Sequence, residues 1–300
     1  MIEVNGLTKR YGNVLALSAV SFSVAEGELF GLIGPDGAGK TTLFRLLATL
    51  LNADEGTASV NGFDVVKDYK SIRNCVGYMP GKFSLYPDLS VKENVDFFAA
   101  LFGVTLEENY DLIAPIYKQI EPFKDRRAGK LSGGMKQKLA LCCALIHKPK
   151  VLFLDEPTTG VDAVSRSEFW DMLSNLKQKG ITMLVSTPYM DEASRCDRIA
   201  LCNEGKILCI DAPANLTKNF DTPLYALAAD DMFALLNAVR SIPNVGDVYP
   251  FGEFHHLFSY SELDCGKVSD ELSKRGCNNL TIKKIEPTIE DVFIKLMNNE

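Results

Sequence analysis

Apolar runs alternate with segments of helical spacing along most of the chain. Largely apolar runs at 28–33, 151–156 and 182–186 predict buried β-strands, and a run closed by a proline at 75–80 predicts another. Apolar residues recur with helical spacing at 43–48, 90–102, 112–120, 134–146 and 167–177. Strands that alternate with helices in this way predict an α/β fold, with a mainly parallel sheet covered by helices on both faces.

Other stretches follow a period of two residues. Residues 2–5 and 19–24 alternate apolar and polar side chains, which predicts half-buried strands. The run 56–62 predicts a strand that ends in an Asn61-Gly62 turn, and 199–208 predicts a hairpin around Asn203 and Glu204.

The character of the sequence changes after Lys218. Beyond it we expect elements in the order β-α-β-β-α-β, followed by a closing helix. They are predicted at 224–229, 232–240, 245–251, 254–260, 268–274, 280–285 and 289–297. This order is that of a small ferredoxin-like α+β unit. No catalytic group stands out there, so 221–300 is expected to be an accessory domain for interaction or regulation, separate from 1–218.

Composition limits the classes of function. The 300 residues carry a net charge of −7, which argues against broad nucleic-acid binding. No apolar run approaches the roughly 20 residues that a membrane-spanning helix needs. Residues 1–6 have neither a basic nor an apolar leader segment, so we expect no secretion signal. The 8 scattered cysteines include no Cys-x-x-Cys pair and are expected to be reduced.

One stretch carries specific chemistry. Gly34-Pro35-Asp36-Gly37-Ala38-Gly39-Lys40-Thr41-Thr42 fits the template G-x-x-x-x-G-K-[ST], between a predicted strand and a predicted helix. This context points backbone N–H groups and a helix N-terminus at an anion. We expect Lys40 to reach the β- and γ-phosphates of a nucleotide and the Thr41 hydroxyl to bind Mg²⁺.

Two carboxylates end the strand predicted at 151–156. Asp155 and Glu156 would lie at its carboxyl end, where α/β sheets bind their ligands. Asp155 is suited to hold Mg²⁺ through water, and Glu156 to polarise an attacking water molecule. A role as a helix cap is the weaker alternative.

A second turn precedes a helix at Leu131-Ser132-Gly133-Gly134. A Ser-Gly-Gly turn at a helix N-terminus is a candidate anion site, although an ordinary helix cap also fits these residues.

Two aromatic features stay open on the residues alone. Tyr11, beside a glycine turn, is either a stacking platform for a purine or a packing residue. The apolar side chains of Phe83, Leu85 and Tyr86 either form a contact surface or fold back on the core.

In this order, the motifs resemble those of the ATP-binding subunit of an ABC transporter over residues 1 to about 215. The phosphate loop 34–42 and Leu131–Gly134, which is similar to the family's signature motif, carry the resemblance. Residues 151–156 are similar to the Walker B strand of the family, and 157–162 to the loop after it. The segment 287–293 looks like that of exporter ATPases, and Asp36, where most members have asparagine, occurs in multidrug-type relatives.

The resemblance implies a P-loop NTPase core of the ABC type with a helical subdomain at about 88–147. It also implies that two ATP-binding subunits, identical or different, meet head to tail and drive a separate transmembrane permease. Each ATP, with Mg²⁺, would lie between one phosphate loop and the partner's Ser132, Gly133 and Gly134, with Tyr11 stacked on adenine. The chain would lie at the cytoplasmic face of the inner membrane, held there only through the permease.

Three positions depart from the family pattern. Gly81 stands where the family has a glutamine near Mg²⁺ and the attacking water, and Pro188 where it has a histidine at the γ-phosphate. Met135 replaces the usual glutamine of the signature motif. Because glycine has no side chain and proline has neither an imidazole nor a backbone N–H, we expect ATP binding to persist and hydrolysis to be slow.

The leading hypothesis is an ATPase that energises an exporter. One alternative is a nearly inactive ATP-binding regulatory subunit that completes a partner's site. Another is a soluble ATPase of the same family that acts on DNA or ribosomes, but the acidic charge and the segment 287–293 argue against it.

Overall fold

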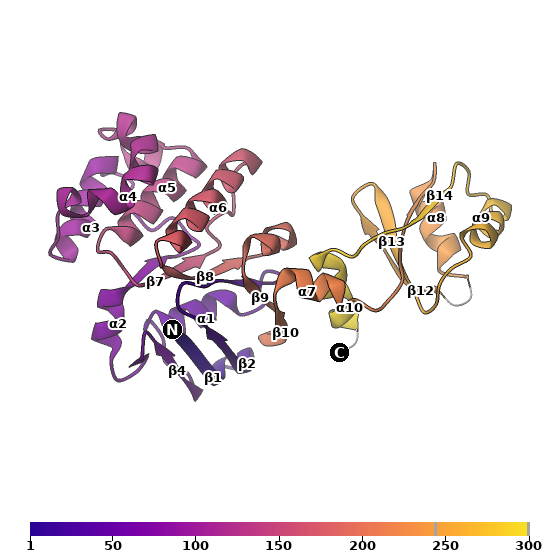
Figure 1. Ribbon diagram of the computed structural model, residues 1–300, viewed down its shortest axis with the longest axis horizontal. Coiled ribbons are helices and arrows are strands. Elements are labelled where there is room, and N and C mark those ends of the chain that lie inside the picture. The colour runs from indigo at the N-terminus through magenta and orange to yellow at the C-terminus, as the bar shows by residue number, and fades with distance from the viewer. Residues whose placement is uncertain (243–244, 299–300) are drawn as a thin grey trace. The chain divides into compact units, whose positions relative to one another are not determined.

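The computed structural model describes residues 1–242 and 245–298, drawn as a ribbon in Figure 1. The chain forms two compact units, of which the first covers Met1–Pro213 and the second begins at Ala214. Each unit has a hydrophobic core of its own.

A six-stranded sheet forms the centre of the first unit, in the order β10-β9-β3-β8-β7-β6. Its strands are β3 (Leu29–Ile33), β6 (Val76–Met79), β7 (Val151–Asp155), β8 (Thr182–Thr187), β9 (Arg198–Asn203) and β10 (Lys206–Asp211). All neighbouring pairs are parallel except β9 and β10, which form the predicted hairpin. Strands β3, β7 and β8 are buried along their whole length, which explains their unbroken apolar runs. The prediction of a mainly parallel sheet is confirmed.

A second sheet of this unit is antiparallel, in the order β2-β1-β4-β5. It consists of β1 (Ile2–Tyr11), β2 (Val14–Val24), β4 (Glu55–Val60) and β5 (Phe63–Asp64). The alternating patterns predicted strands here, but they did not predict a separate sheet. Strands β1 and β2 continue to a tight turn, so Tyr11 lies at the last position of β1.

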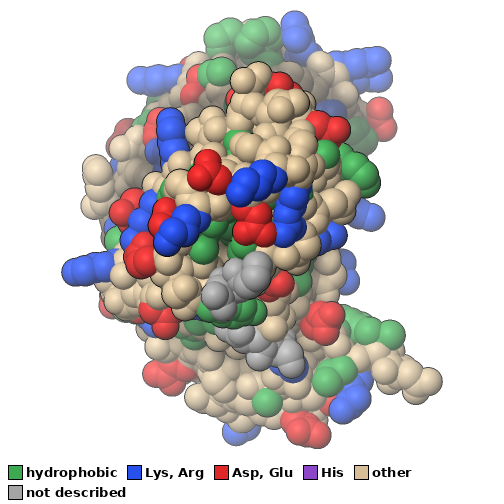
Figure 2. Space-filling model, turned by 90° about the vertical axis from the view of Figure 1, so that its right-hand side faces the viewer, with side chains coloured by type: hydrophobic (Ala, Val, Ile, Leu, Met, Phe, Trp, Pro, Cys, Tyr) green, Lys and Arg blue, Asp and Glu red, His purple; other side chains and the backbone are tan. Residues whose placement is uncertain are grey.

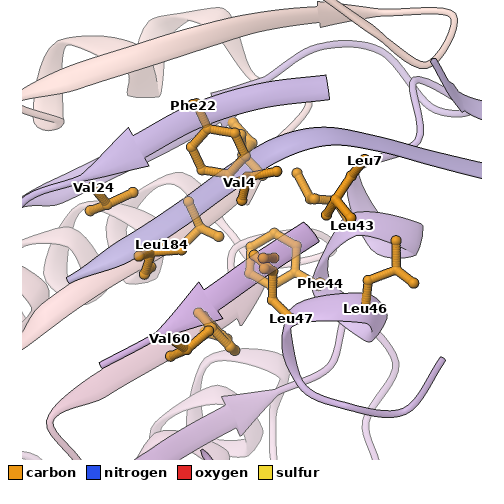
Figure 3. Close-up of a cluster of buried hydrophobic side chains, with 14 of the residues drawn as sticks. Val4, Leu7, Phe22, Val24, Leu43, Phe44, Leu46, Leu47, Val60 and Leu184 are labelled. Carbon is orange, nitrogen blue, oxygen red and sulfur yellow. The ribbon is translucent and has the colours of Figure 1, made fainter. Parts of the chain in front are cut away.

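Helix α1 (Lys40–Leu47) lies between the two sheets. Figure 3 shows the cluster that holds it, which joins Leu43, Phe44, Leu46 and Leu47 to Val4, Leu7, Phe22, Val24, Val60 and Leu184. The Phe44 ring also meets Phe153 of β7 edge-on, with the ring centroids 5.9 Å apart. Each large apolar side chain contributes about 1.5–3 kcal/mol when fully buried, so this cluster fixes the start of α1 and the loop before it.

The other helices of the first unit are α2 (Tyr69–Cys75), α3 (Val91–Leu101), α4 (Leu106–Ile120), α5 (Gly133–Leu145) and α6 (Ala163–Gln178). The 3₁₀ turns are η1 (Glu121–Phe123), η2 (Ala128–Lys130) and η3 (Met190–Arg195), and α7 (Pro213–Lys218) spans the division between the units. A capping box of Ser90 and Glu93 starts α3. None of the helices in the described part of the chain has both the length and the hydrophobicity needed to cross a bilayer.

The second unit is built on a four-stranded antiparallel sheet, in the order β12-β13-β11-β14. Its strands are β11 (Leu224–Ala228), β12 (Val245–Phe251), β13 (Phe254–Ser259) and β14 (Thr281–Lys284). Helices α8 (Met232–Val239) and α9 (Cys265–Lys274) contribute Leu235 and Leu272 to a core that they share with Leu227 and Leu257 of the sheet. The elements follow the predicted order β-α-β-β-α-β.

Helix α10 (Ile289–Asn298) closes the second unit. Its fully buried Asp291 accepts hydrogen bonds from the Tyr249 hydroxyl at 2.5 Å, His256 Nδ1 at 2.6 Å and the Thr288 hydroxyl at 2.6 Å. Burial alone would raise the pKa of Asp291, but the bonds from Thr288, Tyr249 and His256 hold it below its ordinary value. The side chains of His256 and Leu257 point to opposite faces of the sheet, so α10 lies on the face opposite α8 and α9.

Candidate nucleotide-binding site

The loop 34–39 connects buried β3 to α1 in a conformation that only small residues allow. Gly37 and Gly39 have φ values of 85° and 91°, in the left-handed region that favours glycine. A Cβ on Gly34 would lie 2.1 Å from the Cys202 carbonyl oxygen, and one on Gly39 would lie 2.4 Å from that of Ala16. The loop therefore packs backbone against backbone and turns toward the N-terminus of α1, as a phosphate-binding loop requires.

Lys40 is the first residue of α1 and is only 4% exposed. Its Nζ donates to the carbonyl oxygens of Gly34 at 2.8 Å and Pro35 at 3.0 Å. The same ammonium group lies 3.3 Å from Glu156 Oε1. The loop thus folds around the lysine and places its charge beside the carboxylate at the end of β7.

Asp155 ends β7 and Glu156 follows it, and the adjacent strand β8 holds both of them. The Ser186 hydroxyl donates to Asp155 Oδ1 at 2.7 Å, while the backbone N–H of Glu156 donates to Ser186 Oγ at 2.9 Å. Glu156 has a φ of 52°, an uncommon value for a residue with a side chain. Ser186 and the strained backbone together aim the Glu156 side chain toward Lys40.

A hollow of about 660 Å³ lies over the loop, open to solvent. Its lining includes Tyr11, Gly37, Ala38, Gly39, Lys40, Thr41, Thr42 and Glu156. Tyr11 is 43% exposed, so its ring is available to a flat ligand. A nucleotide needs a positively charged group for its phosphates and an aromatic surface for its base, and the hollow has both in Lys40 and Tyr11.

The turn 131–134, called the signature turn below, does not line this hollow. Ser132 caps α5, and its hydroxyl accepts a hydrogen bond from the Met135 N–H at 3.4 Å. Gly133 and Gly134 form the first turn of that helix, and Ser132 and Gly133 are exposed. Within one chain, the two predicted anion sites are therefore separate.

Gly81 packs against the residues Asp155 and Glu156. A Cβ on Gly81 would lie 3.1 Å from the Asp155 carbonyl oxygen and 3.7 Å from Glu156 Cβ. Pro188 follows the last residue of β8, two positions after Ser186. The two positions that lack the expected polar side chains thus adjoin the strand ends that hold Asp155 and Glu156.

The structure also answers the open question about the loop after β6. Leu85 is buried and packs into the core, while Phe83 and Tyr86 are 38% and 48% exposed. The Tyr86 ring meets Phe97 of α3 with the centroids 4.8 Å apart. One apolar side chain of this loop folds inward, and two remain available for contact.

The sequence did not predict a part in the site for Ser186, Glu192, Glu204 or Lys206. Ser186 joins the Asp155 carboxylate to the Glu156 backbone, and Glu204 and Lys206, from the β9–β10 hairpin, contribute to the lining. Glu192 in η3 is buried and accepts hydrogen bonds from Thr158, in the loop after β7, and from Thr187, at the end of β8. The place of Ser186 at the carboxyl end of a buried strand was the one available signal, because such ends meet at one edge of the sheet.

Comparison with known proteins agrees with this geometry. The profile of the family described as ABC transporter matches residues 17–159. The Nod factor export ATP-binding protein I of Burkholderia orbicola (strain AU 1054) is 41% identical, over 100% of this chain and 97% of its own length. The probable multidrug ABC transporter ATP-binding protein YbhF of Escherichia coli (strain K12) is 40% identical over 99% of this chain, which spans 52% of that relative.

Solved structures show the same architecture. The structure of an ATP-binding subunit of an ABC transporter superposes with a TM-score of 0.67 at 27% identity, over 73% of this chain and 93% of the other. The match to the Nod factor export protein covers nearly the full length of both chains, and this chain has the phosphate loop and the two carboxylates at the end of β7. The chain belongs to the ATP-binding proteins of the ABC transporter family.

Proposed function

We propose that this chain binds and hydrolyses ATP to energise an ABC exporter, together with a second ATP-binding subunit and a separate transmembrane permease. The ATP-binding domain would cover residues 1–218, with its helical subdomain at about 88–147, and the accessory domain would cover 221–300. The observation that carries this proposal is a hollow lined by Lys40 and Glu156, with Gly81 packed against Glu156. It combines intact binding groups with a missing side chain at the carboxylates.

The hollow and the groups beside it fit a nucleotide. Residues 34–42 would bind the phosphates of ATP through the loop backbone and Lys40, and Tyr11 would stack on the adenine. The Thr41 hydroxyl and the Asp155 carboxylate are hard oxygen donors, which suits them to hold Mg²⁺. When bound, this ion would neutralise charge on the phosphate oxygens.

Hydrolysis would depend on Glu156, whose carboxylate is suited to polarise an attacking water molecule. Gly81 and Pro188 provide neither the amide nor the imidazole that the family uses at these two positions to orient that water and the γ-phosphate. The loss of such positioning groups costs on the order of 10²–10³-fold in rate. We infer that ATP binds at this site and that its hydrolysis here is slow.

The signature turn is proposed to serve a second subunit. Its exposed Ser132 and Gly133 lie outside the chain's own hollow, and together with Gly134 they would face the nucleotide of the partner. This chain keeps the signature turn, while its own site lacks the glutamine and histidine at Gly81 and Pro188. The combination supports pairing with a subunit whose own site is complete. A chain that only completes its partner's site, with almost no turnover of its own, is the alternative that the same two positions favour.

The permease would bind near the loop after β6. A hollow of about 650 Å³ lies there, lined by apolar side chains that include Leu85, Phe98 and Leu101. Leu101 and the neighbouring Tyr86 are 64% and 48% exposed. An apolar groove with exposed apolar margins is suited to a helix of another protein. Through that contact alone the chain would lie at the cytoplasmic face of the inner membrane.

We propose no nucleic-acid partner. The net charge is −7, and on the face seen in Figure 2 basic and acidic side chains are interspersed. Binding to nucleic acid depends on a continuous basic surface, and that face does not offer one.

Binding and turnover measured on the same preparation test the proposal. The purified chain should bind MgATP with an affinity that Glu156→Gln does not weaken. Its steady-state turnover should exceed that of Glu156→Gln only slightly. Failure to bind MgATP would refute the proposal, and so would fast turnover that Glu156→Gln abolishes, since the chain would then be a complete motor by itself.

A further inference from the structure

Glu192 forms a buried hydrogen-bonded centre that nucleotide binding and catalysis, as derived above, do not use. It is 4% exposed. Its Oε2 accepts hydrogen bonds from the hydroxyls of Thr158 at 3.0 Å and Thr187 at 2.5 Å. Its Oε1 accepts a bond from Arg166 Nε at 3.0 Å. One carboxylate therefore binds three separate segments: the loop after Glu156, the end of β8 and the first turns of α6.

The bonds at β8 enclose Pro188. Thr187, which donates to Glu192, also accepts a hydrogen bond from the backbone N–H of Tyr189 at 3.1 Å. The guanidinium carbon of Arg166 lies 4.0 Å from the centroid of the Tyr189 ring. Both neighbours of Pro188 are thus tied to the same centre.

The bonds at Thr158 and Arg166 enclose the segment on which the signature turn rests. A Cβ on Gly133 would lie 3.2 Å from the Gly160 carbonyl oxygen, and one on Gly134 would lie 2.8 Å from Ser165 Oγ. Gly160 is two residues from Thr158, and Ser165 adjoins Arg166. The segment 158–166, against which the signature turn packs, is therefore hydrogen-bonded to Glu192 at both of its ends.

We propose that Glu192 is a positioning residue that fixes the position of the signature turn relative to Pro188, at the end of β8 in the chain's own nucleotide site. This rests on the proposed function in so far as the turn serves a partner's nucleotide. The carboxylate acts through Thr158 and Arg166 and contacts no nucleotide itself. A change in the loop after Glu156 would thereby reach the surface offered to the partner, because close-packed segments move together.

The three hydrogen bonds use both oxygens of the carboxylate, because Oε2 accepts from Thr158 and Thr187 and Oε1 accepts from Arg166. Thr158 and Thr187 are 1% and 0% exposed, so their hydroxyls have no access to bulk water. Removal of a buried acceptor leaves its donors unsatisfied, which loosens the segments that carry them. Asp191 also binds Arg166, through Nη2 at 3.2 Å, but its side chain is 76% exposed.

Amide hydrogen exchange on the full chain, read from peptides that cover 132–136 and 157–162, tests the inference. Thr158→Val keeps the shape of the side chain and removes its hydroxyl, while Thr158→Ser keeps the hydroxyl and removes a methyl group. We expect exchange in both peptides to rise at least fivefold in Thr158→Val and in Glu192→Gln. Thr158→Ser and the exposed control Asp191→Asn should match the wild type.

Wild-type exchange at 132–136 in folded Thr158→Val overturns the inference, even if Glu192→Gln fails to fold. Faster exchange in Thr158→Ser than in Thr158→Val also overturns it, because packing rather than the hydroxyl would then matter. ATP affinity should stay within twofold of the wild type in both Thr158 variants, and a larger loss in Thr158→Val contradicts the separation of the turn from the hollow. A wild-type chain that binds no ATP refutes the proposed function alone, since the exchange result does not depend on nucleotide.

Discussion

Lys40 Nζ lies 3.3 Å from Glu156 Oε1 and donates at the same time to the carbonyl oxygens of its own loop. This contact joins the first residue of α1 to the residue after β7, which are 116 positions apart in the sequence (156 − 40). It places a fixed positive charge and a carboxylate on one wall of the hollow.

Lys40→Met should weaken MgATP binding by roughly 10- to 100-fold. A charge-assisted hydrogen bond contributes about 1.5–3 kcal/mol, and methionine keeps the length of the side chain without its charge. Titration calorimetry measures the change. Lys138→Met, at an ion pair with Glu168 outside the hollow, is the matched control and should bind as the wild type does. Equal affinities of the two variants would rule out a phosphate role for Lys40.

Thr41→Val should weaken ATP binding only when Mg²⁺ is present. The substitution removes the hydroxyl proposed to hold the ion and changes little else in shape. We expect about a tenfold loss with Mg²⁺, the value of one hydrogen bond to a charged group, and none after chelation with EDTA. A loss that persists in EDTA would mean that Thr41 acts on the phosphates or on the loop instead.

Tyr11→Ala should reduce ATP affinity, and Tyr11→Phe should preserve it. Stacking of a base on an aromatic ring contributes about 1–3 kcal/mol, and phenylalanine keeps the ring while it removes the hydroxyl. Competition with a fluorescent ATP analogue gives the ratio of the two affinities. Similar losses in both variants would assign the effect to the hydroxyl rather than to stacking.

Asp291→Asn should destabilise the second unit by about 1–3 kcal/mol at neutral pH, because it removes a buried charged acceptor from Tyr249, His256 and Thr288. The pKa of Asp291 is lowered in the folded chain. Its stabilising contribution is therefore present above the ordinary aspartate pKa of about 4 and is lost as the pH falls below that value.

Calorimetric unfolding of the full chain at pH 7 and at about pH 3.5 checks this sign. The gap between the wild type and Asp291→Asn should narrow at the lower pH, while exposed Glu253→Gln stays close to the wild type at pH 7. A gap that widens on acidification would contradict the lowered pKa.

The local parts of the fold and site followed from the sequence because their causes are local. The strand, loop and helix around Lys40, the helix at α3 and the hairpin of β9 and β10 each depend on neighbouring residues. Their signals are the apolar period and the special demands of glycine and helix caps.

Long-range relations escaped prediction. Periodicity predicts that β1 and β2 are strands, but not that they pair in a sheet apart from β3. Ser186 and Glu192 are ordinary polar residues in the sequence, and their roles arise only where separate segments meet. The two outcomes for the loop after β6 also depended on packing, since Leu85 folds inward while Phe83 stays exposed.

The most direct test restores the two missing side chains. Gly81 packs against Asp155 and Glu156, and Pro188 follows β8, so Gly81→Gln with Pro188→His should supply the amide and the imidazole that these two positions lack. We expect the steady-state ATP turnover of the double variant to exceed that of the wild type at least tenfold, from the cost of a missing positioning group. MgATP affinity should change little, and the further substitution Glu156→Gln should abolish the gain. A folded, ATP-binding double variant that turns over no faster than the wild type would contradict the claim that these two positions limit hydrolysis.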